Sequence, residues 1–237
     1  MFYPSKNQEA QEGESQWISI SDLMSVLMMI FLFIAISYMI NVVKERERIK
    51  EIAVAYNQLQ DELYQDLHSE FENDLEKWNA SIDRQTLSIK FESPEVLFEQ
   101  GSDVLRNEFR TILMDFFPRY INILTSEKYI DDIEEIRIEG HTSSEWATNN
   151  YPQEAYIGNM KLSQDRTREV LAYVLLLDQV KDNRAWIKDK VTANGLSSSK
   201  LVITEEGEED KDKSRRVEFR VRTNAEKRMV KILTGTE

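Results

Sequence analysis

The longest apolar stretch of the chain runs from Leu23 to Ile40, and only two serines and one tyrosine interrupt it. At about 1.5 Å per residue, a helix over residues 18–43 spans roughly 39 Å, which is enough to cross the hydrocarbon core of a bilayer. A cleaved signal peptide would begin with basic residues, whereas residues 1–16 carry one lysine and three glutamates. The pattern therefore predicts a single uncleaved transmembrane helix over residues 17–43.

A carboxylate, Asp22, lies one turn inside the edge of this helix, directly after Ser21. An ionised aspartate in the centre of a membrane costs ~2.5–3.5 kcal/mol, and less near an edge, so such a group tends to face a bundle interior or a water path. The position favours a group that binds and releases an ion, and a helix-capping residue at the headgroup boundary is the alternative. Trp17 and Ile18 extend the apolar stretch before Asp22 and favour the ion-binding interpretation.

No glycine or proline occurs between Gly13 and Pro94, so nothing in the sequence ends the helix at the bilayer surface. Beyond the membrane the larger apolar residues recur at steps of three or four positions: Ile49, Ile52, Tyr56, Leu59, Leu63, Leu67, Phe71, Leu75, Trp78 and Ile82. This stripe predicts a helical linker over residues 44–85 that pairs with a second copy of the chain in a coiled coil. Packing of the helix on its own domain is the alternative.

Strands and helices alternate over residues 86–223. Apolar alternation in "LSIKF" predicts a strand, a second should end at Gly140, and "KVTANG" and "RRVEFRVR" predict two more. Helical spacing predicts one helix with an N-cap at Ser102 and a bend or interruption at Pro118, and another helix that begins with a cap at Ser163. The expected fold class is α+β, with helices on one face of a sheet.

Composition excludes several classes of function. A net charge of −13 without a cluster of Lys and Arg argues against a nucleic-acid partner. Because there is no cysteine and there are only two histidines, we expect neither a thiolate nor a histidine-rich metal site, and no cofactor. The chain also lacks a Gly-x-Ser-x-Gly elbow and a Walker glycine loop, so we do not expect an enzyme.

Three segments of the predicted domain, "IEGHTSSEW", "NMKLSQDRTREVLAYVL" and "SRRVEFRV", resemble in this order the OmpA-like peptidoglycan-binding domain. The resemblance covers roughly residues 86–223 and implies that the domain binds the peptide stem of the cell wall. It implies a binding role for Arg166, with Asn159 and Leu162 beside it and Thr142 in the preceding turn. A guanidinium can hold a carboxylate by two parallel hydrogen bonds, and the peptide stem is rich in carboxylates.

The chain departs from this family at the turn. Members usually carry an aspartate after Gly-His-Thr, whereas this chain has Ser143, so an ammonium group of the peptide stem would lose its anionic partner. Glu145 lies two positions further on and is a candidate replacement. For Arg166, a solvated surface salt bridge is the alternative to ligand binding.

A span with the pattern W-x-x-x-x-D-L-M, a helical linker and a C-terminal OmpA-like domain together resemble the B subunits of ion-driven stator units. These include the flagellar MotB proteins and ZorB of the Zorya anti-phage system, and Ser21 directly before Asp22 makes the span more similar to ZorB. The resemblance implies a homodimer inside a pentameric ring of ZorA- or MotA-like multi-span subunits, with H⁺, or alternatively Na⁺, carried by Asp22. It also implies that residues 44–63 can plug the ion path. A flagellar stator subunit and a passive envelope tether are the alternatives, and a tether would not need Asp22.

The orientation of the span follows from the domain rather than from the charges. Four basic residues follow the span, and the positive-inside rule would place them in the cytoplasm. Peptidoglycan lies only outside the inner membrane, so a wall-binding domain outweighs these charges. We expect a single-pass inner-membrane protein with a cytoplasmic tail over residues 1–16, a periplasmic domain and a C-terminal tail over residues 224–237.

Overall fold

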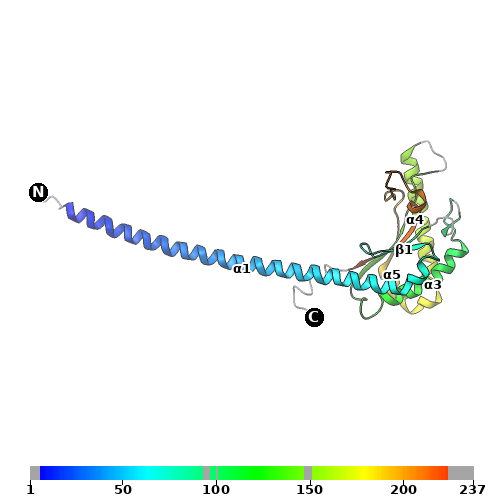
Figure 1. Ribbon diagram of the computed structural model, residues 1–237, viewed down its shortest axis with the longest axis horizontal. Coiled ribbons are helices and arrows are strands. Elements are labelled where there is room, and N and C mark those ends of the chain that lie inside the picture. The colour runs from blue at the N-terminus through cyan, green and yellow to red at the C-terminus, as the bar shows by residue number, and fades with distance from the viewer. Residues whose placement is uncertain (1–5, 93–96, 100, 147–150, 224–237) are drawn as a thin grey trace. The chain divides into compact units, whose positions relative to one another are not determined.

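The computed structural model describes residues 6–92, 97–99, 101–146 and 151–223 (Figure 1). The chain forms two compact units, one up to Val54 and one from Ala55 onward. The second unit therefore begins inside the segment that the sequence predicted as a linker. The predicted C-terminal tail lies outside the described residues.

The first element is α1 (Lys6–Leu75), a helix of 70 residues. It begins within the predicted N-terminal tail. Its most apolar 18-residue window has a mean hydropathy of 2.5, and none of that window is buried. Side chains such as Leu23 and Phe33 are 71% and 73% exposed. By length and composition this helix can cross a membrane, where lipid would cover these side chains.

The apolar stripe of α1 is buried within the chain's own domain from Leu59 onward. Leu63, Leu67 and Phe71 have no exposed surface and share one core with the strands. The members of the stripe that follow Phe71 pack against this core: Leu75, Trp78 and Ile82. The prediction that these positions pair with a second copy is therefore wrong, because elements far along the sequence bury them.

Charged contacts fasten α1 to helix α3 (Asn107–Leu124). Arg119 of α3 donates from Nε to Glu70 Oε1 at 2.7 Å and from Nη1 to Asp74 Oδ2 at 3.0 Å. Its guanidinium also lies 4.9 Å from the ring centre of Phe71. The hydrogen bond from Arg119 lowers the pKa of Asp74. The end of α1 is thus part of the domain and not a separate rod.

A five-stranded sheet in the order β1-β2-β5-β3-β4 forms the centre of the domain. The strands are β1 (Ala80–Asp83), β2 (Ser88–Phe91), β3 (Ile133–Gly140), β4 (Val191–Gly195) and β5 (Val217–Thr223). β3 and β4 pair in parallel, and the other neighbours are antiparallel. The four predicted strands are confirmed. β1 was missed because Ile82 continues the helical spacing of the preceding stripe.

The helices that follow are α3, α4 (Pro152–Leu175), the 3-10 helix η1 (Asp178–Asn183), α5 (Arg184–Lys190) and α6 (Lys211–Ser214). The ring of Phe219 in β5 contacts Phe116 and Tyr120 of α3, so α3 covers the apolar face of the sheet. α4 packs on the same face, against Gly140 and Gly195. Glu218 and Arg220 alternate with these apolar positions on the opposite face. The predicted α+β fold with helices on one face of the sheet is confirmed.

Of the two local predictions for α3, the cap at Ser102 is wrong, and Pro118 does not interrupt the helix. Ser102 does not cap it, because the helix begins at Asn107 and the Ser102 hydroxyl accepts from the backbone N–H of Val104 at 3.1 Å in the preceding turn. Pro118 lies inside α3 without interrupting it. The neighbouring Phe117 has no exposed surface, so burial of this face holds the helix together across the proline.

The predicted start of α4 is also wrong. The helix begins at Pro152, a residue type that suits the first turn because its missing N–H is not needed there. Ser163 therefore lies in the helix interior, where its Oγ donates to the carbonyl of Met160 at 3.0 Å. The same Oγ accepts from the backbone N–H of Ser197 at 3.1 Å, which ties α4 to the loop after β4.

Candidate functional site

Asp22 lies well inside α1. The helix begins at Lys6, so Asp22 does not cap it, and the capping alternative is wrong. The Asp22 side chain is exposed on the helix surface. Its neighbours Leu23 and Met24 are 71% and 58% exposed. The carboxylate thus belongs to a surface whose other side chains favour lipid or a partner helix.

The serines near Asp22 use their hydroxyls within the helix backbone. Ser21 Oγ donates to the carbonyl of Trp17 at 2.9 Å, and Ser25 Oγ donates to the carbonyl of Ser21 at 2.8 Å. Adjacent helix positions point in different directions, so Ser21 is not placed to hold the Asp22 carboxylate. A partner for that carboxylate would therefore be water or another chain.

The Gly-His-Thr turn starts where β3 meets α4. A Cβ atom at Gly140 would lie 2.7 Å from Thr167 Cγ2 and 2.8 Å from the Ser163 carbonyl oxygen, so glycine is needed for the close approach. The next residues, His141 and Thr142, are 5% and 3% exposed. The motif glycine therefore brings the end of β3 directly onto the helix that carries Arg166.

Arg166 lines a small pocket together with His141 and Arg215. Its Nε donates to the Ser102 carbonyl at 2.8 Å, and its guanidinium carbon lies 4.7 Å from the ring centre of Phe98. Burial lowers the pKa of Arg166 to about 10, so the group stays charged at neutral pH. Among the described residues no carboxylate lies within ion-pair distance of it. The salt-bridge alternative is therefore not supported, and the charge is available to a carboxylate ligand.

The other residues predicted to bind peptidoglycan have different surroundings. Asn159 Nδ2 donates to the carbonyls of Ser143 at 3.1 Å and Glu145 at 3.0 Å, so Asn159 holds the turn in place. Thr142 Oγ1 is buried without a hydrogen-bond partner in the described part of the chain. Leu162 is half-buried. Of these predicted residues, the arginine is the one that lines the pocket.

Glu145 is not among the described residues that line the pocket of Arg166. Its carboxylate pairs with Lys211 and lies 4.0 Å from Arg215. The hydrogen bond from Lys211 lowers the pKa of Glu145. Ser143 is 3% exposed and carries no charge. The charged residues among the described lining of the pocket are Arg166, Arg215 and Arg216.

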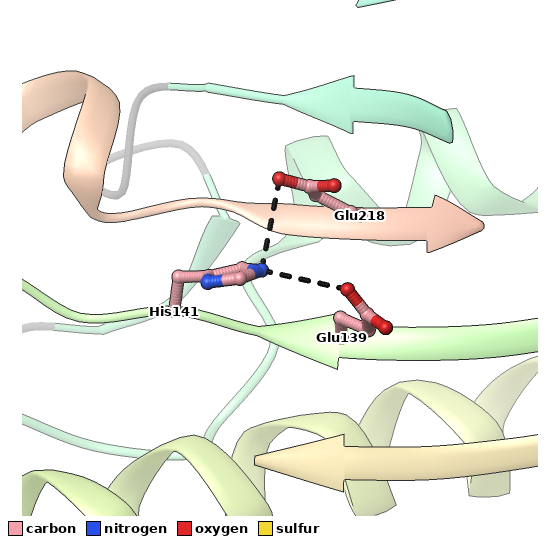
Figure 2. Close-up of side chains that lie close together, drawn as sticks. All are labelled: Glu139, His141 and Glu218. Atoms are coloured by element: carbon pink, nitrogen blue, oxygen red, sulfur yellow. Dashed lines mark ion pairs between the residues drawn. The ribbon is translucent and has the colours of Figure 1, made fainter. Parts of the chain in front are cut away.

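A second group of side chains, Glu139, His141 and Glu218, lies together on the polar side of the sheet, as Figure 2 shows. His141 Nε2 lies 3.6 Å from Glu218 Oε1 and 3.9 Å from Glu139 Oε2. Burial, with the nearby charge of Arg216, lowers the pKa of His141 to about 4. Burial also raises the pKa of Glu139. At neutral pH the imidazole is therefore neutral.

Comparison with curated proteins finds a relative over almost the whole chain. The Zorya protein ZorB of Escherichia coli is 47% identical over 230 residues, which cover 97% of this chain and 95% of the relative. The chain belongs to the ZorB family. No protein-family model matches it. The predicted similarity to ZorB, which relied on the span and the three domain segments, is confirmed.

Solved structures are more distantly similar to this ZorB-family chain. A MotB-like protein from Desulfovibrio vulgaris is 22% identical with a TM-score of 0.49, covering 73% of this chain and 93% of its own. The periplasmic domain of Helicobacter pylori MotB is 18% identical with a TM-score of 0.45, covering 66% and 89%. The cell wall anchor of the T6SS from Pseudomonas aeruginosa is 21% identical with a TM-score of 0.45, covering 67% and 97%. Likenesses at this level do not decide function.

Sequence reasoning missed the cluster of Glu139, His141 and Glu218 in this ZorB-family chain. The expectation of no metal site considered cysteine and histidine but not a single histidine combined with carboxylates. The spacing Glu-x-His in β3 was a usable signal, because alternate strand residues share a face. The pairing that brings Glu218 opposite Glu139 was not readable from the sequence.

Proposed function

We propose that the chain is the B subunit of an ion-driven rotary motor in the inner membrane, within a Zorya anti-phage defence system. The observation that carries this proposal is the 47% identity to a Zorya protein ZorB along almost the entire length of both chains. An aspartate in the interior of an apolar helix, Asp22, supports the ion-driven part of the proposal. H⁺ is the proposed ion, and Na⁺ is the alternative.

Asp22 supplies the chemistry of this proposal. Loss of contact with water favours the neutral form of a carboxylate, and contact with water or a donor favours the ionised form. A carboxylate that alternates between two such environments takes up a proton on one side and releases it on the other. Because no described side chain of the chain itself holds Asp22, the alternating environments come from surrounding subunits.

The proposed assembly is a homodimer of this chain inside a pentameric ring of ZorA-like multi-span subunits. The exposed apolar side chains around Asp22 favour contact with other helices or lipid. A charged group in a span usually faces a bundle interior, which places Asp22 toward the ring. Rotation of the ring around the pair would then follow the protonation cycle of Asp22.

The proposed anchor of the motor is peptidoglycan, bound through Arg166 in the pocket at the end of β3. The half-buried, positively charged guanidinium suits a carboxylate of the peptide stem. The N-terminus is then cytoplasmic and the domain periplasmic. A periplasm-dependent reporter enzyme fused to the C-terminus should be active, and an inactive fusion would contradict both the topology and the wall anchoring.

The test of the Asp22 proposal is phage plating on cells that produce the chain with its ZorA-like partner. Asp22→Asn keeps the shape and removes the charge, so protection should fall to the level of cells without the system. Ser25→Ala is the matched control in the same helix, because the hydroxyl of Ser25 donates to the backbone carbonyl of Ser21. Full protection by Asp22→Asn would contradict ion carriage and leave a passive tether as the better account.

The test of the anchor is cosedimentation of the purified full chain with isolated cell-wall sacculi. Arg166→Ala should weaken the affinity for sacculi at least about tenfold and so lower the bound fraction, since a charge-assisted contact is worth about 1.5–3 kcal/mol. Arg168→Ala is the matched control, because Arg168 lies two residues further along α4 with its side chain 63% exposed. Equal binding by both variants would remove Arg166 from the proposal.

A further inference from the structure

Two buried carboxylates face each other across neighbouring strands in this domain. Glu139 of β3 lies directly opposite Glu218 of β5 in the register of the sheet. They are 5% and 6% exposed. Like charges directly opposite each other destabilise a sheet, and burial increases the cost. The arrangement therefore calls for a positive partner between the two strands.

The imidazole of His141 is oriented toward this pair, while the backbone N–H of His141 donates to the carbonyl of Arg216 at 3.0 Å. Both of its ring nitrogens are buried without a hydrogen-bond partner among the described residues. The distances of 3.6 Å from Nε2 to Glu218 and 3.9 Å to Glu139 exceed those of N–H···O bonds, which are about 2.7–3.2 Å. Buried polar atoms nearly always have a partner, so an imidazole left open beside two carboxylates indicates a ligand.

The spacing of the three side chains fits ligands around a metal ion. The ligand atoms of Glu139, His141 and Glu218 lie within 4.8 Å of one another. Zn²⁺ holds nitrogen and oxygen ligands at about 2.0–2.2 Å, so neighbouring ligands of a tetrahedral ion lie roughly 3.3–3.6 Å apart. Small side-chain movements would close the cluster to that size. One imidazole with two carboxylates suits zinc or a similar transition ion better than Ca²⁺ or Mg²⁺, which prefer oxygen ligands alone.

We infer that Glu139, His141 and Glu218 form a binding site for a divalent transition-metal ion, with Zn²⁺ as the probe. Arg216 supports the site from outside, because its Nε donates to Glu218 Oε1 at 2.6 Å and orients that carboxylate. A bound ion would join β3 to β5 beside the pocket that Arg166 lines, since His141 lines that pocket as well. The site is independent of the proposed ion path at Asp22.

Cations around the cluster offer the competing explanation. Arg216 pairs with Glu218, and Lys90 of β2 lies opposite Glu218 in the register. The positive charges of Arg137 and Arg220 also favour the ionised form of Glu139. If these side chains alone balance the two carboxylates, no metal ion is needed. The two explanations differ in whether the protein binds zinc.

The test is zinc binding by the full chain, purified without a histidine tag in detergent and stripped with a chelator. After equilibration with zinc and gel filtration, mass spectrometry should find about one zinc ion per chain. The chain has two histidines, so His68→Gln is a matched control, because His68 is a half-buried residue of α1 outside the cluster. His141→Gln and the nearly isosteric Glu139→Gln should each weaken binding at least about tenfold.

Each result decides the matter. Zinc retained by the wild type and His68→Gln, but lost from His141→Gln and Glu139→Gln, supports the site. A wild type that holds no zinc, or ligand variants that hold as much as the wild type, overturns it. Loss from His68→Gln alone would place the zinc on the surface of α1 and also overturn it. Circular dichroism of each variant without zinc shows whether it is folded. If His141→Gln does not fold, Glu139→Gln still tests the site.

Discussion

The burial of the α1 stripe predicts a large effect for Leu67→Ala in a soluble fragment that begins at Lys44. Leu67 has no exposed surface, and truncation of a buried leucine costs about 2–5 kcal/mol. For a domain of this size each kcal/mol lowers the Tm by about 2–4 °C, so a loss near 3 kcal/mol should lower it by about 6–12 °C. Trp78 packs against Phe71 and contributes to the fluorescence that follows unfolding, together with Trp146 and Trp186.

Val54→Ala is the matched control for Leu67→Ala. Val54 lies in the same helix but is 59% exposed, and its truncation should change stability by no more than about 0.5 kcal/mol. If Leu67→Ala unfolds at the same temperature as the wild type, Leu67 is not buried in the core of its own domain and the reasoning is refuted.

Three further predictions concern the sheet and the segment after the membrane. Gly140→Ala should cost about 1–3 kcal/mol in the same melting assay, because a Cβ would lie 2.8 Å from the Ser163 carbonyl oxygen, and unchanged stability would contradict this packing. Burial acts to raise the pKa of Asp83, but hydrogen bonds from Lys90 and the turn hold it at about 2, below its usual 3.8. The stability that ionised Asp83 contributes is thus present above about pH 4 and is lost as the pH falls toward 2. The Tm difference between the wild type and Asp83→Asn should therefore shrink over this pH range. A Tm difference that stays constant would refute this role of Asp83. Deletion of residues 44–54 removes 11 residues, which is close to three helical turns. Ion leak and growth arrest after this deletion would indicate that the segment is a plug. Loss of phage protection without ion leak would indicate that it is a spacer.

Much of the fold was predictable because its signals are local. The length of the apolar run predicts the span, and the period of two in "LSIKF" and "RRVEFRVR" predicts β2 and β5. The order of three short motifs indicates the domain type. These signals need only neighbouring residues, and the structure agrees with them.

The remaining features depend on contacts between distant parts of the chain. The stripe at Leu63 and Leu67 has the spacing of a coiled coil, but α3 and the sheet bury it, and they follow later in the sequence. The carboxylate of Glu145 is held by Lys211, which lies 66 positions further on. The buried cluster requires the pairing of β3 with β5. No local pattern encodes these pairings, so sequence reasoning reached the fold but only part of the site.

The shortened linker also sharpens the plug prediction. Leu59 and Leu63 belong to the core, so they cannot leave it to block an ion path without unfolding part of the domain. The residues that remain for a plug are 44–54, where Ile49 is 55% exposed. The plug stays a prediction for this shorter segment.

The most direct test of the central claim is ion flux through the assembled motor in lipid vesicles. Vesicles that hold the chain with its ZorA-like partner are given a pH gradient, and a trapped pH-sensitive dye reports proton movement. We expect proton flux with the wild type and none above empty vesicles with Asp22→Asn, while Ser25→Ala conducts like the wild type. Equal flux with Asp22→Asn would contradict the claim that Asp22 carries the ion.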